Sequence, residues 1–360
     1  MSAPGPALSV VRALVGAALQ SPSAENNQPF VYTWDGETLA VIHQAHRARK
    51  SLDPRFHTSM LTLGCVLESL DIAADAHGLR PMFTLNHGLP EDGPWAEVTF
   101  ERGTSGRAAL APWLPRRSTD RRPFGGGPAS HPVFARVEAE ASRHPPVAVR
   151  RASPQEPELL AFSARAEALF FHHEALYREA LHWLRSSARE ARSRRDGVPL
   201  EAALPGLPTA FGAALLKAPG AREVLARSPA PWVAGRLVTR QLRSSAALLL
   251  LTTRDRGDLA LVPVGRALLG CWLRLTEAGF GVQPHSLASL FVYEEMLGAL
   301  PSYFDHGLMQ QGLGTLRRAF DLDPEELPVL LLRTGLSPSL PPGARTPRRT
   351  VDECLTLTAV

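Results

Sequence analysis

PSAENNQPF, residues 22–30, concentrates amide side chains in one short loop. The whole chain contains three asparagines, and two of them stand here beside a glutamine, between two prolines. The loop separates an apolar run at 7–20, which predicts a helix, from the strand-like FVYTW at 30–34. A carboxamide both donates and accepts hydrogen bonds, so the stretch is interpreted as a binding loop, with an ordinary Asn-rich turn as the alternative.

The composition predicts a folded chain of about two domains, or one large one. Hydrophobic residues make up 44% of the 360 residues and charged residues 21%, which argues against disorder. The richest apolar run, SSAALLLLTT at 244–253, is too short to span a bilayer and predicts a buried strand. Because no basic segment precedes the first apolar residues, we expect no signal peptide, no membrane partner and a cytoplasmic location.

The basic residues are almost all arginines and gather in two clusters. Only Lys50 and Lys217 are lysines, so 37 of the 39 basic residues are arginines. They do not form a stripe with interleaved aromatic residues, and we therefore expect no nucleic-acid partner. The clusters are PRRSTDRRPF at 115–124 and ARTPRR at 344–349.

Other common chemistries leave no motif in this chain. No Walker loop, GxGxxG, GxSxG or HExxH pattern occurs. The chain has three cysteines, Cys65, Cys271 and Cys354. They are far apart and lack CxxC spacing, which predicts that they are small buried side chains and do not form a metal site.

Alternating strands and long helices predict an α+β fold with two units, each built on a mixed sheet. In the first unit the expected elements are helices at 7–20 and 56–78 and strands at 30–34, 38–44, 81–87 and 96–102. A linker at 103–115 leads to the second unit. Its expected elements are helices at 131–143, 154–195, 263–279 and 310–319, strands at 147–151, 244–253 and 329–335, an irregular proline-rich cover at 197–232 and a terminal Pro/Arg-rich tail.

Three motifs in order resemble those of nitroreductase-family flavoproteins, and more narrowly the fused, two-copy, Acg-like branch. The loop pattern is matched by Pro22, Ser23, Asn26, Gln28, Pro29 and Phe30. The basic pattern is matched by Arg117, Thr119 and Arg121, and the tail pattern by Thr346, Pro347, Arg348, Arg349, Asp352 and Glu353. Glu25 departs from this branch, which commonly has a histidine there.

The resemblance implies an intrachain pseudo-dimer of two nitroreductase-like halves with long core helices. Residues 1–112 form the half that supplies the loop. Residues 113–360 form the half that supplies a phosphate clamp, with a covering insertion near 186–232 and an Arg-rich tail at 340–360. No asparagine follows residue 86, so the second half has no counterpart of the loop. We therefore expect one complete FMN site between the halves.

The resemblance also implies roles for particular residues. Arginines and hydroxyls would hold the FMN phosphate, and the loop would contact the polar edge of the flavin ring. Asn27 falls on a variable position and is expected to be solvated, whereas Gln28 is expected to orient the loop. The expected cofactor-binding residues are Pro22, Ser23, Ala24, Asn26, Gln28, Arg117, Ser118, Thr119, Arg121, Pro284, His285, Arg348 and Arg349.

No protein nucleophile is expected, because a flavin carries out the redox chemistry itself. His285 is a candidate proton donor, although a lone histidine is more often structural. One reading is an FMN-dependent oxidoreductase with a small-molecule substrate and NAD(P)H as electron donor. A second is a flavin-storage protein whose cover excludes nicotinamide, and a third is a scaffold without flavin. The chain is expected to be a monomeric pseudo-dimer or a homodimer.

Overall fold

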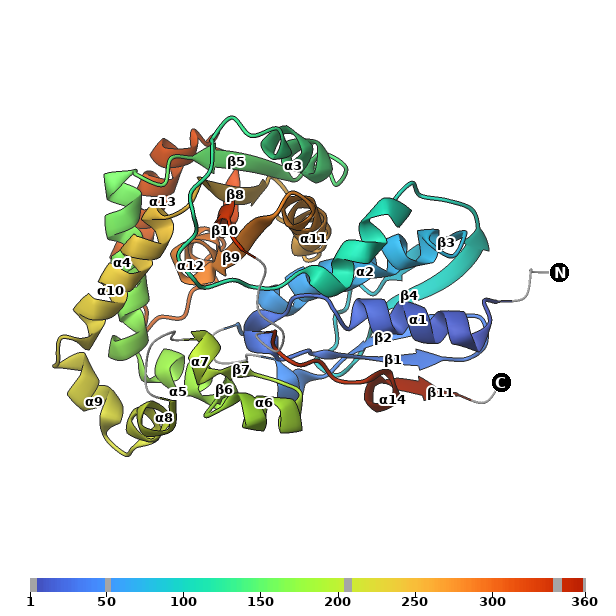
Figure 1. Ribbon diagram of the computed structural model, residues 1–360, viewed down its shortest axis with the longest axis horizontal. Coiled ribbons are helices and arrows are strands. Elements are labelled where there is room, and N and C mark those ends of the chain that lie inside the picture. The colour runs from blue at the N-terminus through green and yellow to red at the C-terminus, as the bar shows by residue number, and fades with distance from the viewer. Residues whose placement is uncertain (1–4, 49–52, 204–208, 339–344, 359–360) are drawn as a thin grey trace.

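Two long helices, α2 (His57–Asp75) and α11 (Leu261–Glu277), lie against each other at the centre of the molecule (Figure 1). The computed structural model describes residues 5–48, 53–203, 209–338 and 345–358. Almost every side chain of α2 is buried, which is expected of a helix that is surrounded by protein on all sides. Each helix belongs to one of the two predicted units, so their contact joins the halves.

Glycines allow these two helices to approach until their backbones touch. A Cβ atom on Gly64 would lie 2.1 Å from the carbonyl oxygen of Val262, and one on Gly265 would lie 2.1 Å from that of Leu61. Cys65 Sγ donates to the carbonyl oxygen of Gly265 at 3.1 Å across the same contact. No larger residue fits at either glycine without separating the helices.

A five-stranded mixed sheet forms the first unit, in the order β11-β1-β2-β4-β3. Its strands are β1 (Phe30–Trp34), β2 (Leu39–His43), β3 (Leu79–Leu85), β4 (Gly93–Arg102) and β11 (Leu355–Leu357). In β1 and β2 alternate residues are buried, because one face packs on the core. Helix α1 (Leu8–Ala18) packs against α2, and both lie beside this sheet (Figure 1).

The second sheet has the order β5-β8-β10-β9 and separates two hydrophobic cores. Its strands are β5 (Ala148–Ala152), β8 (Ala247–Thr253), β9 (Phe280–His285) and β10 (Leu327–Leu336). Leu249 and Leu251 of β8 join the core around α2 and α11, whereas Leu248 and Leu250 join a second, outer core. This alternation explains why every residue of β8 is buried.

The α+β architecture is confirmed, but the second sheet is less mixed than predicted. Its four strands pair only antiparallel, and parallel pairing near it is limited to the isolated bridges Thr119–Val282 and Gly126–Ser245 among the described residues. Its helices are α3 (Val133–Ala141), α4 (Pro157–His172), α10 (Ala230–Arg243), α12 (Leu290–Met296) and α13 (His306–Phe320). In Figure 1, α4, α10 and α13 lie on the side of this sheet away from the first unit.

The predicted single helix at 154–195 is wrong. The chain forms α4, α5 (Glu174–Trp183), the short strand β6 (Leu184–Arg185) and α6 (Ala188–Arg194). His173 interrupts the helix with an extended backbone, and its ring stacks on Phe304 with centroids 5.2 Å apart. Pairing of β6 with β7 (Val198–Pro199) then turns the chain away from a continuous helix.

The predicted irregular cover at 197–232 is largely helical where it is described. It contains α7 (Leu200–Ala203), α8 (Thr209–Lys217), α9 (Ala221–Ala226) and the start of α10, while 204–208 lie outside the described residues. The prolines misled the prediction, because Pro229 and Pro231 stand at the first turn of α10, where no backbone N–H is needed.

The terminal tail contains a helix and a strand that the sequence analysis did not predict. After Thr350 it forms α14 (Val351–Cys354) and then β11, which pairs in parallel with β1 of the first sheet. The C-terminal end of the chain therefore completes the sheet that the N-terminal end begins (Figure 1). None of the described helices combines the length and the apolar composition that crossing a bilayer would need.

Buried ion pairs add a second connection between the halves. Arg107, at the start of the 3-10 segment Ala108–Arg116, pairs with Glu68 of α2 and, at 2.5 Å, with Glu140 of α3. Arg266 and Arg274 of α11 complete the network with contacts to Glu68 at 2.9 Å and Glu140 at 3.0 Å. Each of these buried carboxylates therefore has at least two arginine partners, so neither negative charge is left unpaired.

The Gly64→Ala substitution is expected to destabilise the protein by about 1–3 kcal/mol, because the added methyl group forces the two central helices apart. Gly16→Ala in α1 is the matched control. Its Cβ would meet Val351 Cγ2 at an ordinary 3.7 Å, so replacing glycine within this helix is expected to add about 0.5–1 kcal/mol of stability. Urea unfolding of the three proteins measures both effects, and equal midpoints for Gly64→Ala and the parent would contradict the close contact.

Candidate functional site

The loop at 22–30 forms a tight arch around the 3-10 turn Ala24–Asn26. Glu25, Asn26 and Gln28 all have left-handed φ angles, at 47°, 59° and 50°. Asparagine tolerates this region better than glutamate or glutamine, so the arch stores backbone strain. Ser23 Oγ accepts a hydrogen bond from the Gln28 N–H at 3.0 Å and closes the arch.

The amide side chains of the loop bind two other segments of the chain. Asn26 Nδ2 donates to the carbonyl oxygens of Gly197 at 3.1 Å and Pro347 at 2.9 Å, and its Oδ1 accepts from Arg348. Gln28 Nε2 donates to the carbonyl oxygen of Arg195 at 2.8 Å. The loop therefore holds together the insertion near 195–197 and the arginine tail.

Two expectations for these amides change with the structure. Asn27 was expected to be solvated, but the arch turns it inward and it is only 1% exposed. Arg47 Nε donates to the Asn27 carbonyl oxygen at 2.8 Å and covers it further. All the partners of the Asn26 amide are protein groups, so a contact between this amide and a ligand requires that one of them be exchanged.

The first basic cluster is held against β9 and β10. Asp120 N–H donates to the Val282 carbonyl oxygen at 3.0 Å. Arg333 of β10 is fully buried and donates to the carbonyl oxygens of Asp120 at 3.2 Å and Arg122 at 2.7 Å. These contacts hold the backbone of the first basic cluster in place, and with it the positions from which the side chains of Arg117 and Arg121 extend.

Beside the arch lies a cavity of about 350 Å³ that both arginine clusters line. Five arginines and one carboxylate, that of Glu25, contribute the charge of its wall. Its lining residues are Gln20, Pro22, Ser23, Glu25, Asn26, Arg117, Ser118, Thr119, Arg121, Val198, Ala202, Arg345, Thr346, Arg348 and Arg349. We call this space the arginine cavity.

Arg117 is the most deeply buried of these cations and is incompletely paired. Its side chain is 6% exposed, Nη2 donates to the Gln20 carbonyl oxygen at 2.9 Å, and the guanidinium lies 4.6 Å from the ring centre of Trp272. Its Nε has no hydrogen-bond partner among the described residues. Burial lowers the pKa of Arg117 to about 10, and burial together with Arg117 lowers the pKa of Arg348 to about 9. Both shifts indicate cations that lack a counter-ion.

A mostly apolar cavity of about 200 Å³ continues from the arginine cavity. The two share Pro22, Ser23, Glu25, Thr119 and Arg121. The further lining residues come mainly from the central helices and the end of β9: Ala24, Thr58, Leu61, Thr62, Cys65, Leu268, Trp272, Pro284, Ser286, Leu290 and Leu330. We call this second space the apolar slot. A ligand with an anionic group and a flat apolar body fits such a pair of spaces.

His285 faces a third cavity, which also meets the slot at Pro284 and Ser286. The side chain is 9% exposed, and Nε2 has no hydrogen-bond partner in the described part of the chain. Burial, with smaller effects of Arg333 and Arg121, lowers the pKa of His285 to about 3. The imidazole is therefore neutral near pH 7, so it can only be a weak proton donor.

The structure places most of the predicted site residues around these two spaces. Gln28 lines neither space and binds the carbonyl oxygen of Arg195, and His285 lines the third cavity. Sequence reasoning missed Arg345 and the walls of the slot. A signal was present, since Thr58, Leu61, Thr62 and Cys65 recur at helical spacing along one face of α2.

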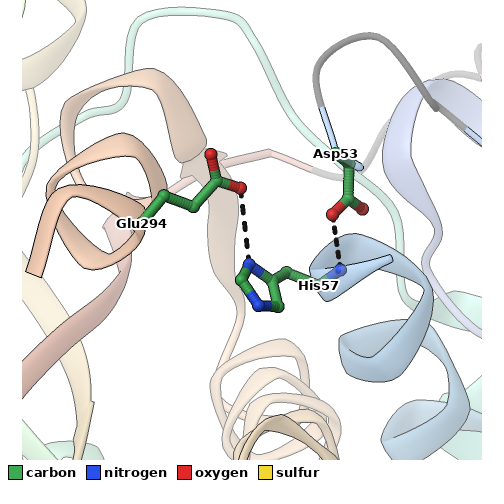
Figure 2. Close-up of side chains that lie close together, drawn as sticks. All are labelled: Asp53, His57 and Glu294. Atoms are coloured by element: carbon green, nitrogen blue, oxygen red, sulfur yellow. Dashed lines mark hydrogen bonds and ion pairs between the residues drawn. The ribbon is translucent and has the colours of Figure 1, made fainter. Parts of the chain in front are cut away.

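A separate cluster at the start of α2 brings together Asp53, His57 and Glu294 (Figure 2). His57 Nδ1 lies 3.5 Å from Glu294 Oε1. The Asp53 carboxylate accepts from the backbone N–H groups of His57 at 2.5 Å and Thr58 at 2.7 Å, and from the Thr58 hydroxyl at 2.5 Å. Because both Asp53 oxygens are occupied, we interpret the cluster as a cap for α2 and not as a metal centre.

Comparisons with known proteins agree with the sequence motifs. No protein-family model matches the chain. The chain is 23% identical over 351 residues to Acg of Mycobacterium tuberculosis, strains CDC 1551 and H37Rv, whose name assigns it as an NAD(P)H nitroreductase. The alignment covers 96% of this chain and 94% of Acg.

Among solved structures, similarity is found to two nitroreductases named NfnB. The FMN- and NADPH-dependent protein of Sphigopyxis sp. strain HMH is 19% identical, with a TM-score of 0.39 over 70% of this chain and 99% of its own. The FMN-dependent protein of Mycobacterium smegmatis, solved with NADPH, is 15% identical, with a TM-score of 0.36 over 68% of this chain and 96% of its own. The predicted resemblance to the nitroreductase family, in its Acg-like branch, is thus confirmed by a relative that matches nearly the whole chain.

Proposed function

We propose that this chain is an FMN-dependent oxidoreductase that acts on a small molecule. One flavin would bind between the half formed by residues 1–112 and the half formed by 113–360. The observation that carries the proposal is the arginine cavity, which contains the incompletely paired guanidinium of Arg117 and adjoins the apolar slot. The name of the relative Acg, which refers to an NAD(P)H nitroreductase, supports a reduced nicotinamide as electron donor.

The donors around the arginine cavity fit an FMN phosphate. Arg117, which is buried, and Arg348, which is half-buried, offer planar, cationic forks, and Ser118 and Thr119 add hydroxyl groups. Asn26 orients Arg348 through its Oδ1 atom. The unpartnered Nε of Arg117 and the lowered pKa values are what a removable dianionic partner would leave behind.

The apolar slot fits the ring system of the same cofactor. Leu61 and Leu268 supply aliphatic walls, while Ser23 at the arch offers a hydroxyl toward a polar edge. When bound there, FMN would supply hydride chemistry, and the chain would bind it, orient it and exclude water. Since the loop comes from the first half and the clamp from the second, neither half alone offers the complete set.

The contacts between the loop at 22–30 and the turn at 195–197 favour a second candidate function, that of a flavin-storage protein. Asn26, Gln28 and Arg47 all bind the turn at 195–197, Arg47 through an ion pair with Asp196 at 3.2 Å. Val198 and Ala202, which follow this turn, line the arginine cavity. A cover held by so many contacts would restrict access of nicotinamide to a bound flavin.

Arg117→Gln is expected to weaken FMN binding about 10- to 150-fold, the loss that follows from removing one charge-assisted bond of about 1.5–3 kcal/mol. Titration of the flavin-free protein with FMN, followed by absorbance between 300 and 550 nm, measures the change. Arg318→Gln is the control, since its ion pair with Glu158 lies on the exposed surface of α13. Equal affinity in Arg117→Gln and the parent would place the phosphate elsewhere.

Gln28→Ala is expected to speed reduction of the bound flavin by NADPH, because the variant loses the bond to Arg195 and loosens the cover. Gln155→Ala, which removes an amide-to-carbonyl bond at the exposed start of α4, is the control. Anaerobic stopped-flow absorbance measures the rate. Fast bleaching in the parent supports an oxidoreductase with open access, while bleaching only in Gln28→Ala supports storage. A parent and variant that bleach at the same rate would argue against gating by this turn.

A further inference from the structure

The outer face of α10 carries exposed apolar side chains and arginines side by side. Trp232, Val233 and Leu237 are 63%, 44% and 46% exposed. Arg236 and Arg240 are exposed on the same face, because residues four apart lie on one side of a helix. The helix therefore presents an apolar and cationic stripe to the surroundings of the molecule.

The two preceding helices extend this face. Helix α9 contacts both α8 and α10, and it adds Val224, which is 69% exposed, while α8 adds Leu215. Five of the ten exposed large apolar side chains among the described residues thus come from these three helices. In Figure 1 they lie at the end of the molecule away from the two chain termini. Scattered apolar residues are ordinary on a protein surface, but such a group on adjoining helices indicates an interaction surface, which we call the α8–α10 surface.

The α8–α10 surface also concentrates the positive charge of the chain. Residues 209–243 contain one carboxylate, Glu223, and six cations, a net charge of +5, whereas the whole chain carries +4. Glu223 is already paired with Arg222 at 2.6 Å. The exposed cations that form no ion pair with a carboxylate in the described part of the chain are Arg227, Arg236, Arg240 and Arg243. The surface therefore offers cations to an external anionic partner.

A second copy of the chain does not suit this surface. In a twofold dimer the same patch of both subunits meets itself. Such an interface would place the arginines of α10 against one another and withdraw them from water without counter-ions, which is costly. The partner must therefore be anionic and must also accept apolar side chains.

The surface of an anionic bilayer meets both requirements. Tryptophan prefers the headgroup level of a membrane, where its ring is apolar and its N–H is hydrated. The guanidinium of Arg236 lies over the Trp232 ring, 4.8 Å from its centre, so an indole and a cation would reach the same depth. Arginine forks match the geometry of lipid phosphates.

We propose that the α8–α10 surface binds membranes rich in anionic phospholipids. Trp232 is the apolar anchor, and the arginines of α10 contact the lipid phosphates. The sequence-based expectation of no membrane partner considered spanning and leader segments, and peripheral binding needs neither of them. The inference goes beyond the proposed redox function and does not depend on it.

The test is cosedimentation of the full chain with vesicles at low salt. One vesicle contains phosphatidylcholine and phosphatidylglycerol in equal amounts, and the other contains phosphatidylcholine alone. Trp232→Ala is expected to weaken binding to the anionic vesicles about 10-fold, because the apolar anchor is lost. Arg236→Gln combined with Arg240→Gln is expected to weaken it about 30-fold, from two lost headgroup contacts.

The matched controls are exposed residues of the first sheet. Met82→Ala on β3, and Arg80→Gln combined with Arg102→Gln on β3 and β4, are expected to bind the vesicles as the parent does. High salt is expected to release the parent from the vesicles, because it screens the arginines. A parent that sediments only with the anionic vesicles, and variants of α10 that sediment less, support the inference.

Three other outcomes overturn it. The first is a parent that sediments with neither vesicle, and the second is variants of α10 that bind as tightly as the parent. The third is loss of a different partner in the variants: a dimer that Trp232→Ala dissociates, or single-stranded RNA that the arginine variant releases, while the parent ignores vesicles. Bound protein is measured with or without FMN, so failure of vesicle binding leaves the proposed oxidoreductase function intact.

Discussion

The contact between Gly64 and Gly265 is the constraint on which the rest of this structure depends. It brings α2 and α11 close enough for the side chains of both to wall one narrow slot. Leu61 on one helix and Leu268 on the other lie one turn or less from this contact, so their separation is set by backbone contact and not by side-chain packing. A larger residue at the crossing would widen the slot as well as loosen the core.

The site is built from three segments that are far apart in the sequence. The arch at 22–30, the clamp at 117–122 and the tail at 345–349 converge because β1 begins at the arch and β11 follows the tail, while Arg333 ties the clamp to β10. The arginines therefore face one another without matching carboxylates. Such a concentration of partly buried positive charge is costly, and α2, the 3-10 turn Ala24–Asn26 and the β-strands must supply the stability that holds it in place.

Much of the fold could be predicted from sequence periodicity. The helix at 56–78 and the strands at 30–34 and 244–253 have strong local patterns, and the structure confirms them within a few residues. The break at His173 could not be predicted, because it depends on stacking with Phe304, more than a hundred residues away. The prolines of α10 and the short strand β11 were missed for related reasons, since position within the helix and a distant partner decide their structure.

The candidate site was predicted only in part. The type of a residue indicates which chemistry it can support, but not which distant residues it contacts in the fold. The loop and both arginine clusters were found as motifs, and the structure brings them to one cavity. That Asn26 binds Gly197 and Pro347 depends on the path of the insertion, which local pattern does not encode.

The pairing of β11 with β1 has a consequence for synthesis of the chain. The first sheet emerges from the ribosome with the edge of β1 open, and that edge is not covered until Leu355–Leu357 have been made. Arg348 and Arg349 lie just before this strand, so the cavity gains its last cations at the same moment. Until these residues have been made, the nascent chain has neither a finished first sheet nor a finished arginine cavity.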